Sequence, residues 1–459
     1  MKIKFLYIYL LLLLCIPVNA AGFEPFFKQG ERVCFVGNSI TNAGEFHHNI
    51  LLYHITRFPN VPATVFNCGV SGDDTERVIR RMESDILVNK PTKAIIMLGM
   101  NDVRRSLYSE KPTTNPGILK QRVEAIELYK ANYENIVKTF LSKNISVVLQ
   151  KPSIYDQTAK LPTANGLGVN DALKQCADFI QQIAEKYKLV TVDYWTIMTN
   201  INAEIQKKDS TATITSKDRV HPQSTGHFIM SYQFLKSMNA PKFVSKIVVN
   251  KNAIRSSKQS LNCKIESLEK TRNQLKLVVK ENALPFPMVE TYSEGAKLVP
   301  FVEDFNNQIL KVEKLPKGNY QLLIDNVLIG EFSHNSLKEG INLALFQKTP
   351  QYLQALQVRD VLKELWQLES GLRGLKFIEG NRFFQESPDK DDVAGMKARL
   401  YPLFEKSYPS NSAFFKSQLD KYFQVKPLEQ EYLQKSDALR LRAFELAQPK
   451  PHTFILKRK

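Results

Sequence analysis

The sequence predicts an α/β protein in which helices cover both faces of a parallel sheet. Between residues 31 and 240, short apolar runs alternate with longer segments of helical periodicity. Strands that are apolar throughout, rather than at every second residue, are buried on both faces, which is typical of parallel sheets. Parallel strands need helical crossover connections, so the alternation itself predicts one domain of this class.

Five apolar runs are the candidate strands, and a helical segment follows each of them. The candidate strands are residues 33–36, 64–66, 94–98, 145–149 and 190–193. The segments with helical spacing are residues 46–58, 74–88, 118–141, 172–187 and 224–238. In the second of these, Val78, Met82 and Ile86 fall on one face, and Thr75 is a plausible N-terminal cap.

Polar, glycine-containing loops follow three of the candidate strands. These loops are residues 37–39, 67–72 and 99–102. In an open α/β sheet, ligands bind at the carboxyl ends of the strands, so the three loops are expected to open on the same edge. The sequence therefore predicts that functional residues from different loops meet at that edge.

The pattern changes after Pro241. Between residues 241 and 335 the helical spacing fades, and strand-like segments separated by turn signals predict a small β-sandwich-like module. The segments are residues 243–249, 275–279, 320–324 and 327–332. From residue 336 to residue 459 we expect a helical region, in which the segments 352–372, 392–406 and 428–447 have helical spacing.

The first 20 residues predict a secretory signal peptide. Lys2 and Lys4 give a positive start, residues 5–18 are apolar, and residues 18–20 offer a cleavage site. We therefore expect a secreted or periplasmic protein whose first domain spans residues 21–240. The alternative is an uncleaved anchor, but the apolar run is shorter than a membrane span needs. No later stretch is long and apolar enough to predict a span.

The chain carries a formal net charge of +17 at pH 7. A field of this sign favours anionic partners such as acidic polysaccharides or membrane surfaces. The alternative is a solvated surface with scattered lysines, and the lysines are indeed spread along the chain. No nucleic-acid-binding motif accompanies the charge, so nucleic acid is not an expected partner. The sequence leaves the oligomeric state open.

Four cysteines follow the predicted signal peptide: Cys34, Cys68, Cys176 and Cys263. None belongs to a Cys-x-x-Cys pair, so neither a zinc site nor a redox motif is indicated. Buried free thiols are the simpler interpretation. A secreted protein would permit a disulfide, but the sequence assigns none.

Ser39, His221 and Asp218 form a candidate catalytic set. A serine hydroxyl is a weak nucleophile, so acyl transfer requires a histidine that takes its proton. Asp218 lies three positions before His221, a spacing that lets the carboxylate hold the imidazole in one tautomer. Each feature alone has a simpler explanation: Ser39 as a helix cap, and the Asp–His–Pro segment as a surface turn.

Asn101 and Gly72 are candidate contributors to an oxyanion hole. The expected donors are the side-chain amide of Asn101 and the backbone N–H groups of Ser39 and Gly72. Glycine suits this place because a backbone without a side chain can approach a substrate closely. The alternatives are a local turn hydrogen bond for Asn101 and a positive-φ turn for Gly72.

Other ionisable side chains lie near these loops. Residues 73–74 and Asp102 are expected to accept loop hydrogen bonds, because no cluster of ligands has the spacing of a metal site. His47, His48 and His54 are expected to be structural or to line the substrate site, with the structural role preferred.

Taken together, these segments resemble the blocks that define the SGNH (GDSL-type) hydrolase superfamily. Residues 37–39 match the nucleophile block, and Gly72 matches the oxyanion glycine block. Residues 99–102 match the asparagine block, and residues 218–222 match the acid–base block. The order and the spacing of the blocks both fit the superfamily.

The resemblance covers about residues 31–240 and implies a flavodoxin-like three-layer α/β/α sandwich. It also implies ester hydrolysis by Ser39 with no metal and no other cofactor. One departure is Asn38, where the superfamily usually has an aspartate; asparagine keeps the shape and hydrogen bonding but not the charge. Residues 340–344 resemble a segment of secreted bacterial relatives that carry an inserted β-module, which implies that the helical region packs on the catalytic domain.

Three functional hypotheses follow. The first is a secreted serine esterase that removes acetyl or another small acyl group from a carbohydrate, with a small-molecule or polysaccharide ester as substrate. The second is a lipase, lysophospholipase or thioesterase, which requires a long apolar acyl groove. The third is a non-catalytic glycan-binding protein. The complete candidate set argues against the third hypothesis: Ser39, Gly72, Asn101, Asp218 and His221.

Overall fold

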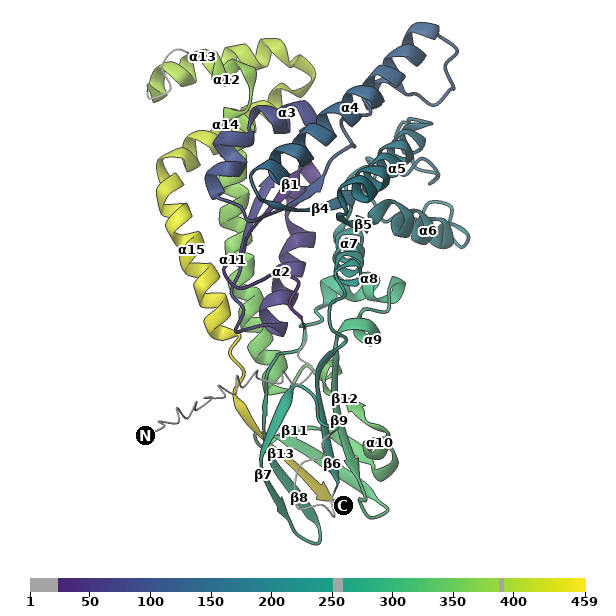
Figure 1. Cartoon of the computed structure of the whole chain (residues 1–459), viewed down its shortest axis with the longest axis vertical. Helices are drawn as coiled ribbons and strands as arrows, with labels where there is room; N and C mark the ends of the chain where they lie inside the picture. Colours follow the sequence, from purple (N-terminus) through teal and green to yellow (C-terminus); the bar gives the residue numbers. More distant parts are fainter. Residues whose placement is uncertain (1–23, 251–258, 388–391) are drawn as a thin grey trace, which may run out of the picture.

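The computed structural model describes residues 24–250, 259–387 and 392–459. The predicted signal peptide, residues 1–20, lies outside the described residues. Figure 1 shows a sheet with its helices in the upper part of the molecule, long C-terminal helices beside it, and a group of strands at the lower end. Within the described ranges, no helix is long and apolar enough to cross a membrane.

The upper part is built on a parallel sheet with the strand order β2-β1-β3-β4-β5. Its strands are β1 (Arg32–Gly37), β2 (Thr64–Gly69), β3 (Lys93–Met97), β4 (Ser146–Lys151) and β5 (Val190–Asp193). Helices flank this sheet, as the apolar runs predicted, and the α/β fold class is confirmed.

Alternate residues of each strand face opposite helical layers. Val33 and Phe35 of β1 belong to the apolar cluster that includes α2 and α7. Cys34 and Val36 belong to the cluster that includes α4 and α5. The helices of this part are α1 (Ser39–Ala43), α2 (Glu45–Arg57), α3 (Thr75–Arg80), α4 (Pro116–Ser142), α5 (Val169–Tyr187), α6 (Tyr194–Gln206) and α7 (Ser224–Ser237).

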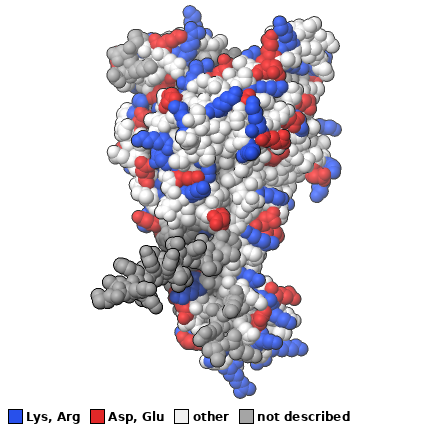
Figure 2. Space-filling model, viewed as in Figure 1, with Lys and Arg blue, Asp and Glu red and all other residues white. Residues whose placement is uncertain are grey.

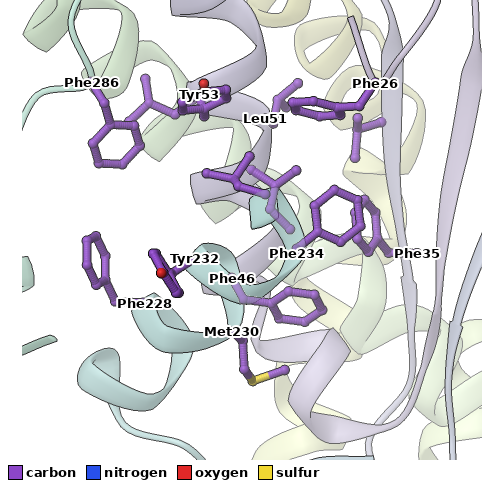
Figure 3. Close-up of a cluster of buried hydrophobic side chains, with 14 of the residues drawn as sticks. Phe26, Phe35, Phe46, Leu51, Tyr53, Phe228, Met230, Tyr232, Phe234 and Phe286 are labelled. Carbon is purple, nitrogen blue, oxygen red and sulfur yellow. The ribbon is translucent and has the colours of Figure 1, made fainter. Parts of the chain in front are cut away.

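Aromatic rings dominate the cluster between the sheet and helices α2 and α7 (Figure 3). Phe35 of β1 lies edge-on to Phe46 of α2, with ring centroids 5.8 Å apart, and 6.0 Å from Phe234 of α7. Such ring pairs add about 0.5–1.5 kcal/mol each to the burial of their surface. The packing fixes α2, and with it the short helix α1 that follows β1.

Residues 74–88 do not form the single helix that the spacing predicted. Helix α3 ends at Arg80, a π-helical turn follows over residues 82–86, and a 3-10 turn follows over residues 87–89. The cap of α3 is Asp74 rather than Thr75, because the Asp74 carboxylate accepts the N–H of Arg77 at 2.9 Å. The irregular stretch begins where the Arg81 side chain turns inward to buried partners.

Two sheets form the lower part, which we call the β-module. The larger has the order β11-β10-β13-β8-β7, and the smaller has the order β12-β9-β6. Its strands are β6 (Phe243–Asn250), β7 (Cys263–Lys270), β8 (Gln274–Glu281), β9 (Asn307–Glu313), β10 (Asn319–Ile324), β11 (Val327–Ser333), β12 (Ile341–Asn342) and β13 (Pro451–Arg458). Apolar residues of both sheets share one core.

The end of the chain differs from the expected helical region. Strand β13 lies between β8 and β10, so the last residues of the chain complete the β-module. Phe454 and Leu456 of β13 are buried in its core. Buried residues alternate with more exposed residues along β13, but the strand is short and follows a helical pattern and a proline-containing stretch. It was therefore not predicted from the sequence. Strands β7, β9 and β12 and helix α6 were also not predicted.

The long helices α11 (Pro350–Glu379) and α15 (Glu429–Leu446) run between the two parts (Figure 1). Between them in the chain lie α12 (Arg382–Gln385), α13 (Val393–Ser407) and α14 (Ser412–Val425), and the short helices α8 (Ser293–Leu298), α9 (Phe301–Phe305) and α10 (His334–Glu339) precede α11. α11 packs against α2 and β2, with α15 beside it (Figure 1). Val358, Leu362 and Leu365 of α11 join the aromatic cluster of the upper part.

Charged side chains form no single dominant cluster on the face shown in Figure 2. Basic and acidic side chains are interspersed there over both parts of the molecule. Cys34, Cys68, Cys176 and Cys263 are free thiols, and the first three are buried.

Candidate active site

Ser39, His221 and Asp218 meet at the carboxyl edge of the sheet. Ser39 is the first residue of α1, directly after β1, and the Asn38 side chain caps this helix by accepting the N–H of Ile40 at 3.1 Å. With its ring proton on Nδ1, His221 donates to Asp218 Oδ2 at 2.5 Å, and its Nε2 accepts the Ser39 hydroxyl at 2.8 Å. The three side chains thus form one continuous hydrogen-bonded chain.

Asp218 is held in its ionised form. Partial burial alone would raise the pKa of this carboxyl group, but hydrogen bonds from His221, Ser216 and two backbone N–H groups outweigh burial and hold the pKa well below its usual range. Ser216 Oγ donates at 2.5 Å, and the N–H groups of Val220 and His221 donate at 2.9 and 3.0 Å. A charged carboxylate is the form that stabilises an imidazolium.

The loop that carries the acid and the base is fixed by Arg219. This residue has a φ of 68°, in the left-handed region, so its side chain points away from those of its neighbours. The buried guanidinium donates to the carbonyl oxygens of Asp156 and Ala159 at 3.0 and 2.9 Å. The sequence did not reveal this role, because Arg219 lies inside a motif whose other members have obvious chemistry.

The site is open to solvent. The side chains of His221 and Asp218 are 44% and 48% exposed, so no part of the described chain closes over them. A hollow of about 430 Å³ lies beside them, lined by Arg105, Tyr108 and Tyr155 among others. Its open form, with charged, polar and aromatic side chains in the wall, suits a small acyl group on a large alcohol better than a long acyl chain that needs an enclosed groove.

The loops after β2 and β3 lie beside the nucleophile loop. The strand register places Gly37 next to both Gly69 and Met97, so the three strand ends align. Gly72 is exposed and has a φ of 81°, a conformation that favours glycine. Asn101 Nδ2 donates one hydrogen bond to the carbonyl oxygen of Asp73 at 2.7 Å, which ties the third loop to the second.

Asp102 accepts loop hydrogen bonds, as expected from the sequence. Its two oxygens accept the N–H groups of Thr75 at 2.8 Å and Gly99 at 3.0 Å. Burial raises the pKa of Asp102 to about 6. The Asp102 carboxylate therefore joins the β3 loop to the start of α3, which is the helix after the Gly72 loop.

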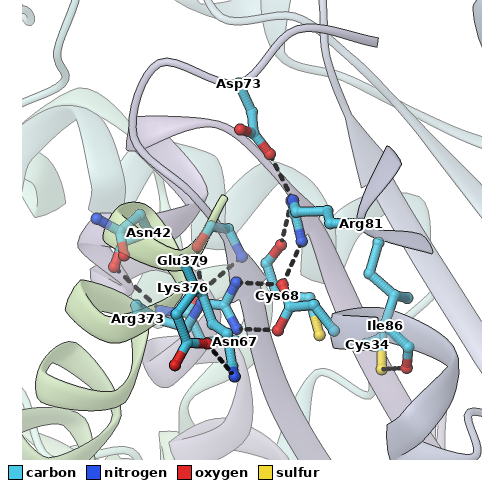
Figure 4. Close-up of polar contacts among 12 residues, drawn as sticks. Cys34, Asn42, Asn67, Cys68, Asp73, Arg81, Ile86, Arg373, Lys376 and Glu379 are labelled. Atoms are coloured by element: carbon cyan, nitrogen blue, oxygen red, sulfur yellow. Dashed lines mark hydrogen bonds and ion pairs between the residues drawn. The ribbon is translucent and has the colours of Figure 1, made fainter. Parts of the chain in front are cut away.

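A buried ion cluster lies beneath these loops (Figure 4). Arg81 Nε donates to Asp73 at 2.6 Å and Nη1 donates to Asp85 at 2.6 Å. Its Nη2 donates to the backbone carbonyl oxygens of Cys68 at 2.8 Å and Gly37 at 3.3 Å. The Arg81 guanidinium therefore contacts the ends of both β1 and β2. The nucleophile loop follows β1, and the Gly72 loop follows β2.

Arg373 of α11 completes the cluster. It forms a two-pronged ion pair with Asp85, at 2.7 and 2.6 Å, and its Nε donates to the carbonyl oxygen of Gly69 at 2.8 Å. Burial alone would raise the pKa of Asp85, but Arg373 and Arg81 outweigh it and hold the pKa far below its usual range. The pair joins positions 288 residues apart, and no local sequence signal predicts such a contact.

The three histidines near the nucleophile have structural contacts. His47 Nε2 lies 3.1 Å from the carbonyl oxygen of Thr41, and His54 Nε2 lies 2.9 Å from that of Val61. Burial lowers the pKa of His47 to about 3 and that of His54 to about 4, so both are neutral at neutral pH. His48 Nε2 lies 2.8 Å from Glu369 of α11.

Comparison with known proteins adds three findings. A model of the GDSL-like Lipase/Acylhydrolase family matches residues 35–229. An acetylxylan esterase from Geobacillus stearothermophilus is 25% identical over 225 residues, which cover 46% of this chain and 94% of that protein. The solved structure of BT4096, a gut microbial diltiazem-metabolizing enzyme, is similar with a TM-score of 0.83 at 30% identity, covering 94% of this chain and 98% of the other.

Proposed function

The chain belongs to the SGNH superfamily of GDSL-like hydrolases and is a serine hydrolase of carboxylic esters, and we propose that it removes O-acetyl groups from carbohydrate with Ser39 as the nucleophile. The observation that carries the proposal is the hydrogen-bonded chain from Ser39 through His221 to Asp218. The hydroxyl, imidazole and carboxylate are arranged as acyl transfer requires.

In the proposed reaction, Ser39 Oγ attacks the ester carbonyl carbon while His221 Nε2 takes the hydroxyl proton. The tetrahedral intermediate collapses, the proton passes from His221 to the departing alcohol oxygen, and acetyl-Ser39 remains. A water molecule then gives a proton to His221 and attacks the acetyl carbon. As this second tetrahedral intermediate collapses, His221 returns the proton to Ser39 Oγ, which restores the hydroxyl and releases acetate. Asp218 stays ionised and stabilises the imidazolium in both steps.

The negative charge of each tetrahedral intermediate requires preorganised donors. We propose the backbone N–H groups of Ser39 and Gly72 and the second N–H of the Asn101 side chain, whose first N–H is held by Asp73. Two features support this choice: the aligned ends of β1, β2 and β3, and the positive φ of Gly72. Removing one such donor typically costs about 2.7–4 kcal/mol of transition-state stabilisation.

The substrate class rests on three supporting observations. The Geobacillus relative is an acetylxylan esterase, which supports an acetylated carbohydrate. The open hollow beside His221, which forms no enclosed acyl groove, supports a small acyl group. The predicted signal peptide supports a secreted or periplasmic location, where polysaccharide substrates are found.

The test is a pair of assays on the wild type and on Ser39→Ala. We expect cleavage of p-nitrophenyl acetate but little cleavage of p-nitrophenyl laurate, and release of acetate from acetylated oligosaccharides. Ser39→Ala should lose both acetate-releasing activities. Preference for laurate would instead support a lipase, lysophospholipase or thioesterase. Binding to glycans without any ester cleavage would support a non-catalytic glycan-binding protein.

A further inference from the structure

Beyond acetyl removal, we propose that a pocket beside the Gly72 loop binds an acidic sugar residue of the substrate, so that the enzyme prefers acetyl esters on uronate-containing carbohydrate. This inference rests on the proposed function. The pocket, which we call the α3 pocket, has a volume of about 220 Å³ and lies between the start of α3 and the C-terminal helices. Its cationic lining residues are Arg77, Arg80, Arg81, Lys376 and Arg382.

The α3 pocket lies close to the nucleophile. Ser71, which lines it, accepts a hydrogen bond from Asn42 Nδ2 at 2.9 Å. Asn42 is three residues after Ser39 in the same short helix, and residues so spaced are separated by only about 5–6 Å. Arg77 Nη1 donates to the carbonyl oxygen of Gly72 at 3.3 Å, so this guanidinium sits against the proposed oxyanion glycine.

Three of the five cations already have carboxylate partners. Arg81 pairs with Asp73 and Asp85, Lys376 with Glu379, and Arg382 with Glu386. Across the described ranges of the chain, no carboxylate lies within ion-pair distance of Arg77 or Arg80, and both are exposed at the pocket. Two guanidinium groups one helical turn apart therefore remain to bind an anion. Guanidinium groups bind carboxylates through paired, charge-assisted hydrogen bonds.

Aromatic rings also line the α3 pocket. Tyr408 stacks on Phe415 with ring centroids 4.2 Å apart, and Phe377 stacks on Phe415 at 6.0 Å. All three rings line the pocket and are only partly buried. A pocket lined by aromatic rings and by two guanidinium groups that have no carboxylate partner matches a sugar ring that has apolar C–H faces and one carboxylate. A neutral sugar would contact the rings but leave Arg77 and Arg80 without a carboxylate partner.

The test compares two substrates that differ only in that carboxylate. Methyl glucuronide and methyl glucoside, each acetylated at the same ring hydroxyl, are assayed for released acetate, and kcat/KM for the uronide is divided by kcat/KM for the glucoside. Any general effect of a substitution on catalysis cancels in this ratio. For the wild type we expect a ratio well above one that falls as NaCl is raised, because salt screens exposed charge pairs.

The variant is Arg77→Gln with Arg80→Gln, which removes both unpaired guanidinium groups. We expect the ratio to fall about fivefold, which is within the reach of two exposed charge pairs that each contribute up to about a fivefold effect. The matched control is Lys264→Gln with Lys280→Gln, an exposed cross-strand pair in the β-module. It removes the same formal charge far from Ser39, and its ratio should equal that of the wild type.

A wild-type ratio near one, or an unchanged ratio in the arginine variant, would overturn the assignment of the α3 pocket. An equal fall in the lysine control would show a general field effect and would overturn it as well. None of these results touches the proposed function, because the glucoside still releases acetate. Failure of the proposed function has a different signature: neither sugar ester nor p-nitrophenyl acetate is cleaved by the wild type.

Discussion

Helix α11 is attached to the parallel sheet and its helices by two buried ion clusters. The clusters lie one helical turn apart on α11 and contact different elements. Glu369 contacts His48 of α2 at 2.8 Å and Arg440 of α15 at 2.8 Å, so it joins helices to one another. Arg373 contacts Asp85 and the carbonyl oxygen of Gly69, so it reaches the strand end on which the Gly72 loop begins. Two buried ion clusters on one helix thus have different partners: Glu369 joins helices to one another, and Arg373 contacts the strand end beneath the candidate site.

This difference predicts that activity and stability respond separately to substitution. The largest expected effect is that of Ser39→Ala, which removes the proposed nucleophile. Loss of a nucleophilic serine typically lowers kcat on the order of a millionfold. Ser39 is the partly buried first residue of α1, and among the described residues its hydroxyl forms a hydrogen bond only with His221. The thermal unfolding midpoint should therefore stay close to that of the wild type. Steady-state kinetics with p-nitrophenyl acetate and a melting curve test both expectations.

The next largest effect is expected at Asn101, which donates a hydrogen bond to Asp73 in the Gly72 loop. Arg81 contacts the same residue. Asn101→Ala removes a proposed oxyanion donor together with its hydrogen bond to the carbonyl oxygen of Asp73. We expect kcat to fall by about 10²–10³-fold, as for other donors of this kind, with a smaller change in KM. A change confined to KM would show that Asn101 binds the substrate but does not stabilise the oxyanion.

A smaller loss of activity is expected from a substitution at Arg373, and it distinguishes the Arg373 cluster from the Glu369 cluster. Arg373→Lys keeps the charge but cannot form both prongs of the pair with Asp85 and also contact Gly69, because lysine lacks the planar fork of arginine. We expect a roughly tenfold lower kcat with little change in KM, since small displacements of catalytic groups are costly. Arg373 acts through the loop backbone and is a positioning residue.

The matched control for Arg373→Lys is Glu369→Gln, which weakens the neighbouring cluster on the same helix. Both variants should unfold at lower temperature, because each leaves buried charges incompletely paired. Only Arg373→Lys should lower kcat. Equal losses of kcat in the two variants would mean that α11 supports the site through general stability, and that the contact with Gly69 has no special role.

The sequence predicted that Ser39, Asp218 and His221 meet at the carboxyl edge of the sheet, but it did not predict the buried contacts beneath that edge. Ser39, Asp218 and His221 were recognisable because they sit in loops at strand ends and in a compact acid–base segment, and local patterns of this kind survive in a single sequence. Asp85 and Arg373 were not, because their contact joins distant positions and each looks like an ordinary charged residue of a helix. The same limit hid β13, whose partners β8 and β10 lie far away along the chain.

The smallest expected effect is on the pH dependence of the free energy of unfolding. It tests whether the Glu369 cluster is held together by charge. Burial alone would raise the pKa of Glu369, but His48 and Arg440 outweigh it and lower the pKa to about 2. A carboxyl group whose pKa is lower in the folded state stabilises the fold fully above its unfolded pKa of about 4.5 and loses this contribution as the pH falls toward about 2.

We therefore expect the free energy of unfolding of the wild type, measured by urea titration, to fall between pH 5 and pH 3 by more than that of Glu369→Gln. The difference arises because glutamine has no proton to gain, and it should reach on the order of 1 kcal/mol or more over this range. Acid-sensitive groups that do not contact Glu369 are common to both proteins and cancel in the difference. Parallel curves for the two proteins would mean that Glu369 is not held in its charged form, and that the cluster joins α11, α2 and α15 by shape and neutral hydrogen bonds instead of by charge.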